Sequence, residues 1–345
     1  MTRLFTAGAE AGSLDVFASI SGVTVSTVQK RTGNYSFLYA DNSVANIDLP
    51  GDKTVLYCRL GLYLTGYWSN TSTFGQFPLI LLKNNLGGNQ VCLCFHYETR
   101  LMSVIRGNWN DTVLLTGTRA IPLNAWCCIE WYIKIADGTD GESTVKLDGA
   151  TDITIPADDT KATAVAGVRT IMLGGAPIVV TTRHSLEGYV DDIAINDNAG
   201  VVNNSWIGRG GVYPKLPTGP GEYADLHASV GDPFECVNEV PPSDADYISD
   251  SVIDQKSTFA GGSVTPATGA VACVNVILRS LLEAGQGEIA ALVRSNGIDA
   301  QGDPVGLDVS AKTVQTIFEL DPGDEPDVAW TIDRVNAMEF GAVVR

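Results

Sequence analysis

Apolar and polar residues alternate most clearly over residues 126–135, with the period of two that is typical of a β-strand. A polar turn at 136–142 and the pair Asp148-Gly149 predict two further strands, at 145–147 and 151–155. Together these segments predict a three-stranded meander, and the segment 188–196 is expected to close its sheet. The apolar side of 126–135 carries Cys127, Ile129, Trp131, Ile133 and Ile135, and the other side carries Trp126, Cys128, Glu130, Tyr132 and Lys134.

The rest of the first two hundred residues repeats short β-branched or aromatic runs between turns rich in Gly, Asn and Ser. No segment there has convincing helical periodicity. A dozen or so short strands without helices predict an all-β, antiparallel sandwich. The main runs are 23–28, 35–39, 54–64, 77–82, 90–97 and 169–175.

The last third of the chain has weaker patterns. Pro and Gly are dense at 208–221 and disfavour both helix and central strand, so a connecting segment is expected there. The apolar runs 271–284 and 288–293 are separated by Gly285-Gln286-Gly287 and are interpreted as a hairpin. Thr331 is expected to cap a helical turn over 332–337, and 338–344 is expected to form the last strand.

Length and charge narrow the class of protein. A chain of 345 residues fits two domains. The formal net charge is −18, with most of the acidic excess in the last third. Such a surface repels phosphates and anionic lipids, so neither nucleic acid nor membrane is expected as a partner. No apolar run approaches bilayer or signal-peptide length, which predicts assembly in a cytoplasm.

Seven cysteines without a signal sequence are expected to be reduced and buried. Cys92, Cys94 and His96 share one face of a predicted strand. Positions i, i+2 and i+4 of an extended strand span about 13 Å, too far to surround one metal ion. No metal site is expected from these residues, and no cofactor is predicted.

Three residues on the non-core side of 126–135 are the candidate site: Trp126, Glu130 and Tyr132. The Trp126 and Tyr132 rings could stack on a sugar, or the same face could pack on the second sheet, a loop or the other domain. Asp191 and Asp192 are adjacent, so an unbroken strand points them to opposite faces. They are interpreted as solvated or turn-bonding acids, with a Ca²⁺ site as the alternative.

A resemblance to a known family rests on the order of five segments. They are 31–37 (Arg-Thr-Gly-Asn-Tyr-Ser-Phe), 123–131 (Leu-Asn-Ala-Trp-Cys-Cys-Ile-Glu-Trp), 145–149 (Val-Lys-Leu-Asp-Gly), 171–175 (Ile-Met-Leu-Gly-Gly) and 188–197 (Gly-Tyr-Val-Asp-Asp-Ile-Ala-Ile-Asn-Asp). This order resembles the concanavalin A-like jelly roll and, more narrowly, two-domain virion structural proteins of tailed bacteriophages. The resemblance implies a jelly-roll sandwich at 1–200, a Pro/Gly-rich connection at 201–224 and a smaller acidic β-sandwich at 225–345.

The same resemblance implies a non-enzymatic structural protein of a phage virion, assembled in the host cytoplasm as a capsid decoration or tail-associated subunit. Its partners would be other virion proteins and further copies of itself in a closed homo-oligomer such as a trimer. The alternatives are a receptor-binding lectin that contacts host surface glycan, and a glycoside hydrolase. Hydrolysis needs two carboxylates facing one sugar, and no strand offers acids alternating on one face.

Overall fold

The structure is a computed structural model that describes residues 2–69, 76–96, 98–175, 184–265, 268–324 and 328–345. The chain divides into two compact units. The first contains Met1–Ala9 and Phe17–Val212, and the second contains Glu10–Val16 and Tyr213–Arg345. Strands make up 53% of the chain and helix 3%, which confirms the predicted all-β class.

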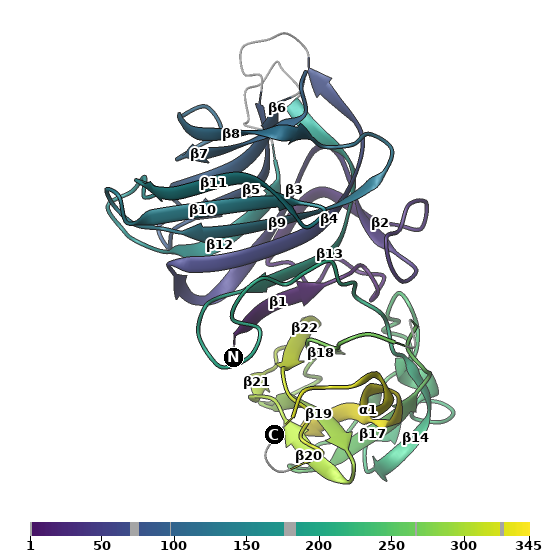
Figure 1. Ribbon diagram of the computed structural model, residues 1–345. Helices are drawn as coiled ribbons and strands as arrows, with labels where there is room; N and C mark the ends of the chain where they lie inside the picture. The colour runs from purple at the N-terminus through teal and green to yellow at the C-terminus, as the bar shows by residue number, and fades with distance from the viewer. Residues whose placement is uncertain (1, 70–75, 97, 176–183, 266–267, 325–327) are drawn as a thin grey trace. The chain divides into compact units, whose positions relative to one another are not determined.

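The first unit is built on one long antiparallel sheet that curves back on itself, and Figure 1 shows β9, β10 and β11 side by side in it. Its path runs β11-β10-β9-β4-β13-β3-β12-β5-β6-β7-β8, with β1 paired to β13 and β2 to β3. The two end strands meet, because Asp152 Oδ1 on β11 accepts hydrogen bonds from the amides of Thr118 and Arg119 on β8, each at 2.9 Å. This closure produces the two layers of a jelly-roll sandwich. The strands are β1 (Arg3–Ala7), β2 (Ser19–Ser26), β3 (Ser36–Lys53), β4 (Val55–Ser69), β5 (Gln76–Lys83), β6 (Asn89–His96), β7 (Leu101–Arg106), β8 (Thr112–Ala120), β9 (Trp126–Lys134), β10 (Gly141–Leu147), β11 (Ala150–Asp158), β12 (Val168–Gly174) and β13 (His184–Asn196).

The predicted meander is confirmed as β9, β10 and β11. Leu147 of β10 pairs with Ile129 of β9, and Val145 pairs with Ile153 of β11. Asp148 and Gly149 both have positive φ, 53° and 80°, the backbone that a tight two-residue hairpin turn requires. The turn therefore fixes how β10 pairs with β11.

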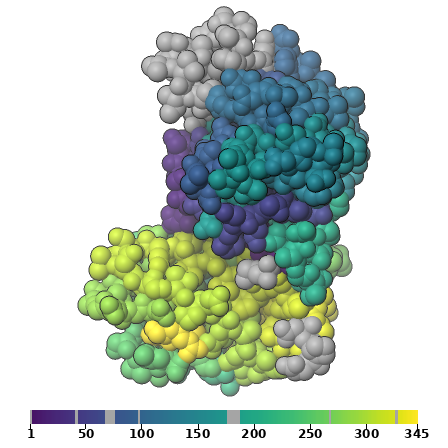
Figure 2. Space-filling model, turned by 90° about the vertical axis from the view of Figure 1, so that its left-hand side faces the viewer, coloured from purple at the N-terminus to yellow at the C-terminus, as the bar shows by residue number. Residues whose placement is uncertain are grey.

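The core of the sandwich lies on the apolar side of β9. Ile129, Trp131 and Ile133 are fully buried, as their alternation predicts. The Trp131 indole donates to Ser143 Oγ at 2.9 Å, which satisfies its one polar atom inside the core. In Figure 2 the purple N-terminal residues and the blue-to-teal residues from the middle of the chain form the surface of this one unit.

The second unit has a sheet in the order β14-β17-β23-β19-β20, with β21 paired to β19, and a two-stranded sheet of β18 and β22. Val276 of β18, Val293 of β19 and Phe318 of β22 belong to one apolar cluster, to which α1 adds Val335. The elements are β14 (Pro217–Ala224), β15 (His227–Ala228), a 3-10 turn (Glu235–Val237), β16 (Ile248–Ser249), β17 (Lys256–Gly261), β18 (Val274–Ser280), β19 (Glu288–Ser295), β20 (Ile298–Gln301), β21 (Val305–Gly306), β22 (Lys312–Phe318), α1 (Ile332–Ala337) and β23 (Glu339–Val344).

Several C-terminal predictions can be compared with these elements. Thr331 caps α1 by accepting from the Arg334 amide at 3.2 Å, as predicted. β18 and β19 are strands, but the predicted hairpin is wrong, because β18 pairs with β22 and β19 with β23. The Pro-rich stretch includes an edge strand, β14, the one place in a sheet where Pro is readily tolerated.

The N-terminal segment Glu10–Val16 belongs to the second unit, although its neighbours in sequence belong to the first. Asp15 pairs with Arg279 at 2.9 Å, and the Val16 carbonyl accepts from Gln315 Nε2 at 3.2 Å. Whether 1–200 and 225–345 are separate folding domains stays a prediction. Among the helices in the described part of the chain, none has the length and apolarity needed to span a membrane.

Candidate functional site

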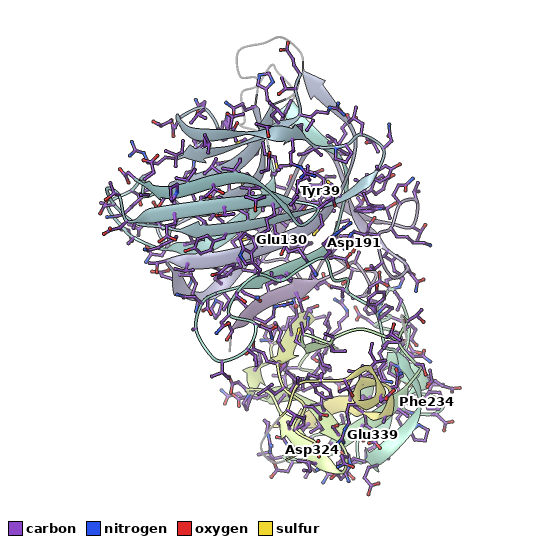
Figure 3. The ribbon with its side chains drawn as sticks, viewed as in Figure 1. Tyr39, Glu130, Asp191, Phe234, Asp324 and Glu339 are labelled. Atoms are coloured by element: carbon purple, nitrogen blue, oxygen red, sulfur yellow. The ribbon has the colours of Figure 1, made fainter. Side chains whose placement is uncertain are left out.

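The candidate residues Trp126, Glu130 and Tyr132 lie on the side of β9 that faces away from the core, as predicted. Their surroundings differ. Trp126 and Tyr132 are half-buried, whereas Glu130 is only 3% exposed. Figure 3 labels Glu130 on this sheet. A sugar at this face could therefore reach Trp126 or Tyr132 but not the Glu130 carboxylate.

Glu130 is buried because residues 203–212, here called the covering segment, pass over the sheet. The Gly208 amide donates to Glu130 Oε1 at 2.7 Å. Asn196 Nδ2 of β13 donates to the Ser205 carbonyl at 3.0 Å, and Val212 donates its amide to Asp192 Oδ1 at 2.6 Å. Part of the segment 201–224, expected to connect two domains, thus packs on the middle of this face.

Asp191 and Asp192 hold the covering segment and the turn at 31–32 to β13. The expectation that they point to opposite faces is wrong, because the pairing of β13 with β4 shifts register between Asp191 and Ala194 and Asp192 has a φ of +53°. This bulge lets both carboxylates reach the same turn. Asp191 Oδ2 accepts the amide of Arg31 at 3.0 Å, and Asp192 accepts Thr32 Oγ1 and the Arg31 guanidinium.

These contacts leave little room for the Ca²⁺ alternative. Every carboxylate oxygen of Asp191 and Asp192 accepts at least one hydrogen bond, and the Arg31 guanidinium already supplies a positive charge. Within the described ranges, no group of three or more His, Cys, Asp or Glu side chains is arranged to hold a metal ion. The residues present do not fit a calcium site.

Burial has an electrostatic consequence at the same place. Asp191 and Asp192 are both 0% exposed. Burial, followed by the neighbouring Asp192 carboxylate, raises the pKa of Asp191 to about 7, although the amides of Arg31, Asp192 and Thr32 oppose the rise. Asp191 is thus a structural acid that titrates near neutrality.

Tyr132 belongs to an aromatic group at one end of the face. Its ring centroid lies 5.0 Å from that of Tyr57 and 6.3 Å from that of Trp206, which comes from the covering segment. Its hydroxyl donates to Glu142 Oε2 at 3.1 Å. Burial and this hydrogen bond raise the pKa of Tyr132 to about 12, so its phenol stays protonated.

Trp126 belongs to a different group at the other end. Its ring lies 5.5 Å from that of Tyr63 on β4, and the Tyr63 ring lies 6.0 Å from that of Tyr189 on β13, each pair edge to face. Strand pairing sets this order, since Trp126 pairs with Tyr63 and Tyr63 with Tyr189. All three are half-buried, and together they are called the aromatic row.

The sequence pattern missed two members of the aromatic row. Tyr63 and Tyr189 have the right alternation in their own segments, but alternation does not say which strands are neighbours. The long pairing of β13 with β4 brings them together. The sequence did contain a signal for the row, since each of these three strands has an aromatic residue on its non-core side.

The cysteines follow their prediction of burial in part. Six are buried and Cys273 is intermediate, and all seven are free thiols. Cys92 and Cys94 share a face with their sulfurs 3.1 Å apart. Cys127 and Cys128 are both buried, although they lie on opposite sides of β9. Neither can reach a second molecule from these positions.

Comparisons with known proteins identify no family for this chain. No family model matches the chain, and no curated protein matches it. An endo-β-1,4-glucuronan lyase from Trichoderma reesei is 13% identical over 56% of this chain and 95% of its own, with a TM-score of 0.41. An alginate lyase from Aplysia kurodai is 13% identical over 56% and 99%, with a TM-score of 0.39. A carbohydrate-binding module from Bacillus subtilis is 9% identical over 52% and 98%, with a TM-score of 0.30.

These findings correct two predictions. The chain was expected to be a non-enzymatic virion structural protein, and that prediction is wrong, because the similar solved structures named here are enzymes that cleave polysaccharides and a carbohydrate-binding module. The narrower phage resemblance gains no support, whereas the jelly-roll sandwich does. At 9–13% identity and TM-scores of 0.30–0.41 these likenesses assign no activity or substrate to this chain.

Proposed function

We propose that this protein recognises carbohydrate at the aromatic row, Trp126, Tyr63 and Tyr189. The observation that carries the proposal is the row itself, three half-buried rings on adjacent strands of one rigid sheet. Aromatic side chains on a rigid scaffold offer apolar surface without losing much conformational entropy on binding. Adjacent strands are about 4.8 Å apart, so the three rings lie across the direction of the strands.

Polar groups lie beside the row. Thr65 and Asn124 are exposed, and Glu187 is half-buried. Thr65 Oγ1 donates to the Glu187 carbonyl at 3.0 Å, and the Asn124 amide donates to the Leu64 carbonyl at 2.8 Å, so both backbones are held in place. Hydroxyl, amide and carboxylate groups around an apolar platform match the mixed surface of a sugar.

The two aromatic groups of this face differ in accessibility. Trp206 from the covering segment packs against Tyr57 and Tyr132, and Lys146 lies 3.5 Å from the centre of the Trp206 ring. Among the described residues, no ring or cation from another segment is stacked on the aromatic row. We therefore assign carbohydrate to Trp126 and its neighbours rather than to Tyr132.

The test is affinity electrophoresis of the full chain in gels that contain single polysaccharides. Retardation by at least one of them is expected, and Trp126→Ala should weaken it by about tenfold, as removal of a central aromatic contact does. Trp126→Phe, which keeps a ring, should retain part of the binding. Tyr247→Ala, at an aromatic residue that is 49% exposed in the second unit, is the matched control.

Two outcomes would overturn the proposal. One is equal retardation of the parent and Trp126→Ala proteins, and the other is no retardation by any polysaccharide.

The homo-oligomer expected from the sequence stays a prediction, and light scattering measures it. A stable oligomer that dissociates on Trp126→Ala would place the row in a subunit contact instead. Assay of the same mixtures for newly formed reducing or unsaturated chain ends reports whether the bound chain is cleaved.

A further inference from the structure

We infer that the glycan held by the aromatic row is a neutral one and not a polymer of uronic acids. This inference rests on the proposed function and adds the substrate class. A uronate polymer presents a carboxylate on each sugar, and proteins recognise carboxylates with Arg or Lys side chains. The question is therefore whether the row has a cation available.

Among the residues that the structure describes, the strands of this face offer none close to the row. The Lys and Arg residues of β4, β9, β10 and β13 are Arg59, Lys134 and Lys146. Arg59 is 4% exposed and donates to the Asp192 carbonyl at 2.9 Å. Lys146 lies over the Trp206 ring. Lys134 pairs with Glu142 at 3.0 Å, and its position on β9 is about 26 Å from Trp126 along an extended strand.

The two segments that pack on the face bring cations that are already paired. Arg31 Nη1 donates to Asp192 Oδ2 and to the Gly210 carbonyl, and Arg31 Nη2 donates to the Arg209 carbonyl at 3.1 Å. The Arg209 guanidinium lies 3.6 Å from Asp148 Oδ1. These guanidiniums bind groups of the protein itself, so they are not available to a uronate carboxylate.

Negative charge beside the row also disfavours a uronate polymer. Glu187 lies two residues before Tyr189 on β13, beside the row. Its carboxylate repels a polyanion at the row, whereas it does not repel a neutral polysaccharide. Hydroxyl groups of a neutral sugar can also donate to the Glu187 carboxylate, which a uronate carboxylate cannot do.

The experiment measures retardation of the full chain by neutral polysaccharides (xylan, mannan, β-glucan) and by uronate polymers (alginate, polyglucuronate) at low and high salt. We expect a neutral polymer to bind with an affinity that changes less than about twofold between about 50 and 300 mM NaCl, since no ion pair is screened. Alginate and polyglucuronate should cause no retardation at either concentration.

A gain-of-binding variant sharpens the test. Thr65 is exposed and lies two residues from Tyr63 on the same face of β4, so Thr65→Lys adds a cation beside the row. This variant should acquire salt-sensitive alginate binding, and Thr65→Ala should not. Parent protein that binds only uronate polymers, with loss on Trp126→Ala, would overturn the neutral class and leave carbohydrate recognition standing. Absence of binding to every polymer would overturn both.

Discussion

Gly61 provides the space that the Arg31 side chain occupies over β4. A Cβ added at Gly61 would lie 2.6 Å from Arg31 Cδ and 3.2 Å from the Asp191 carbonyl oxygen. Arg31 in turn bonds Asp192 and the carbonyls of Arg209 and Gly210. The absence of one side chain on β4 therefore lets one guanidinium tie the sheet to the covering segment.

Gly61→Ala should destabilise the first unit. The added methyl must displace Arg31 or the backbone of β13, a form of overpacking that costs about 1–3 kcal/mol. Urea unfolding monitored by tryptophan fluorescence measures this change. Gly51→Ala is the matched control, because nothing lies within 4 Å of a Cβ at that position. Equal unfolding midpoints for the two variants would show that Arg31 moves aside without cost.

Asp191 should make the unfolding free energy fall as the pH rises toward neutrality. Its pKa is about 7 in the native protein and 3.8 as the reference for an exposed Asp, so the native state binds more protons than the unfolded state between these values. Stability from this group is therefore greatest at the acidic end of that window and is lost by about pH 7, with a slope of at most about 1.4 kcal/mol per pH unit.

Asp191→Asn removes that titration. The difference in unfolding free energy between parent and variant should shift in favour of the variant as the pH rises from 5 to 8, measured by urea unfolding at each pH. Asp140→Asn, in an exposed turn, is the matched control. A variant Asp191→Asn whose curve also stays parallel to the parent would contradict the raised pKa.

Loss of the Glu130 carboxylate should loosen the covering segment. Glu130 Oε1 accepts the Gly208 amide, and a buried donor left without a partner costs about 1–3 kcal/mol. Glu130→Ala should therefore speed amide hydrogen exchange at 206–212, measured by mass spectrometry. Glu130→Gln keeps an acceptor oxygen and should change exchange less. Unchanged exchange in both variants would mean that the contacts of Arg31, Asp192 and Asn196 hold the segment without Glu130.

Trp206→Ala separates the two aromatic groups of the face. It should expose Tyr57 and Tyr132 while leaving the aromatic row intact. Among the described residues, the Trp206 ring packs against Tyr57 and Tyr132 and not against the row. Polysaccharide retardation should then equal that of the parent chain. Loss of retardation with Trp206→Ala, and not with Trp126→Ala, would move the binding site to Tyr57 and Tyr132.

The local structure of this chain is readable from its sequence, and its long-range pairings are not. Alternation along 126–135 predicts β9, and the Asp148-Gly149 turn predicts the hairpin of β10 and β11, because both depend on neighbouring residues. The aromatic row depends on β4 and β13 pairing across more than a hundred residues. The bulge at Asp192 reverses a side chain that strict alternation places on the other face. The position of Trp126 on the non-core side of β9 follows from the pattern, its neighbours Tyr63 and Tyr189 do not, and the use of this face as a binding site stays a prediction.

The early segment Glu10–Val16 has a consequence for how the protein is made and divided. Because this segment belongs with Tyr213–Arg345, the chain passes between the two units after residues 9, 16 and 212. On the ribosome, these residues emerge long before the partners of Asp15 and Val16, Arg279 and Gln315, have been synthesised. A cut after Val212 would leave the first unit whole, with Glu10–Val16 still attached to it, whereas the other fragment would lack that segment, so the second unit can be completed only from the beginning of its own chain.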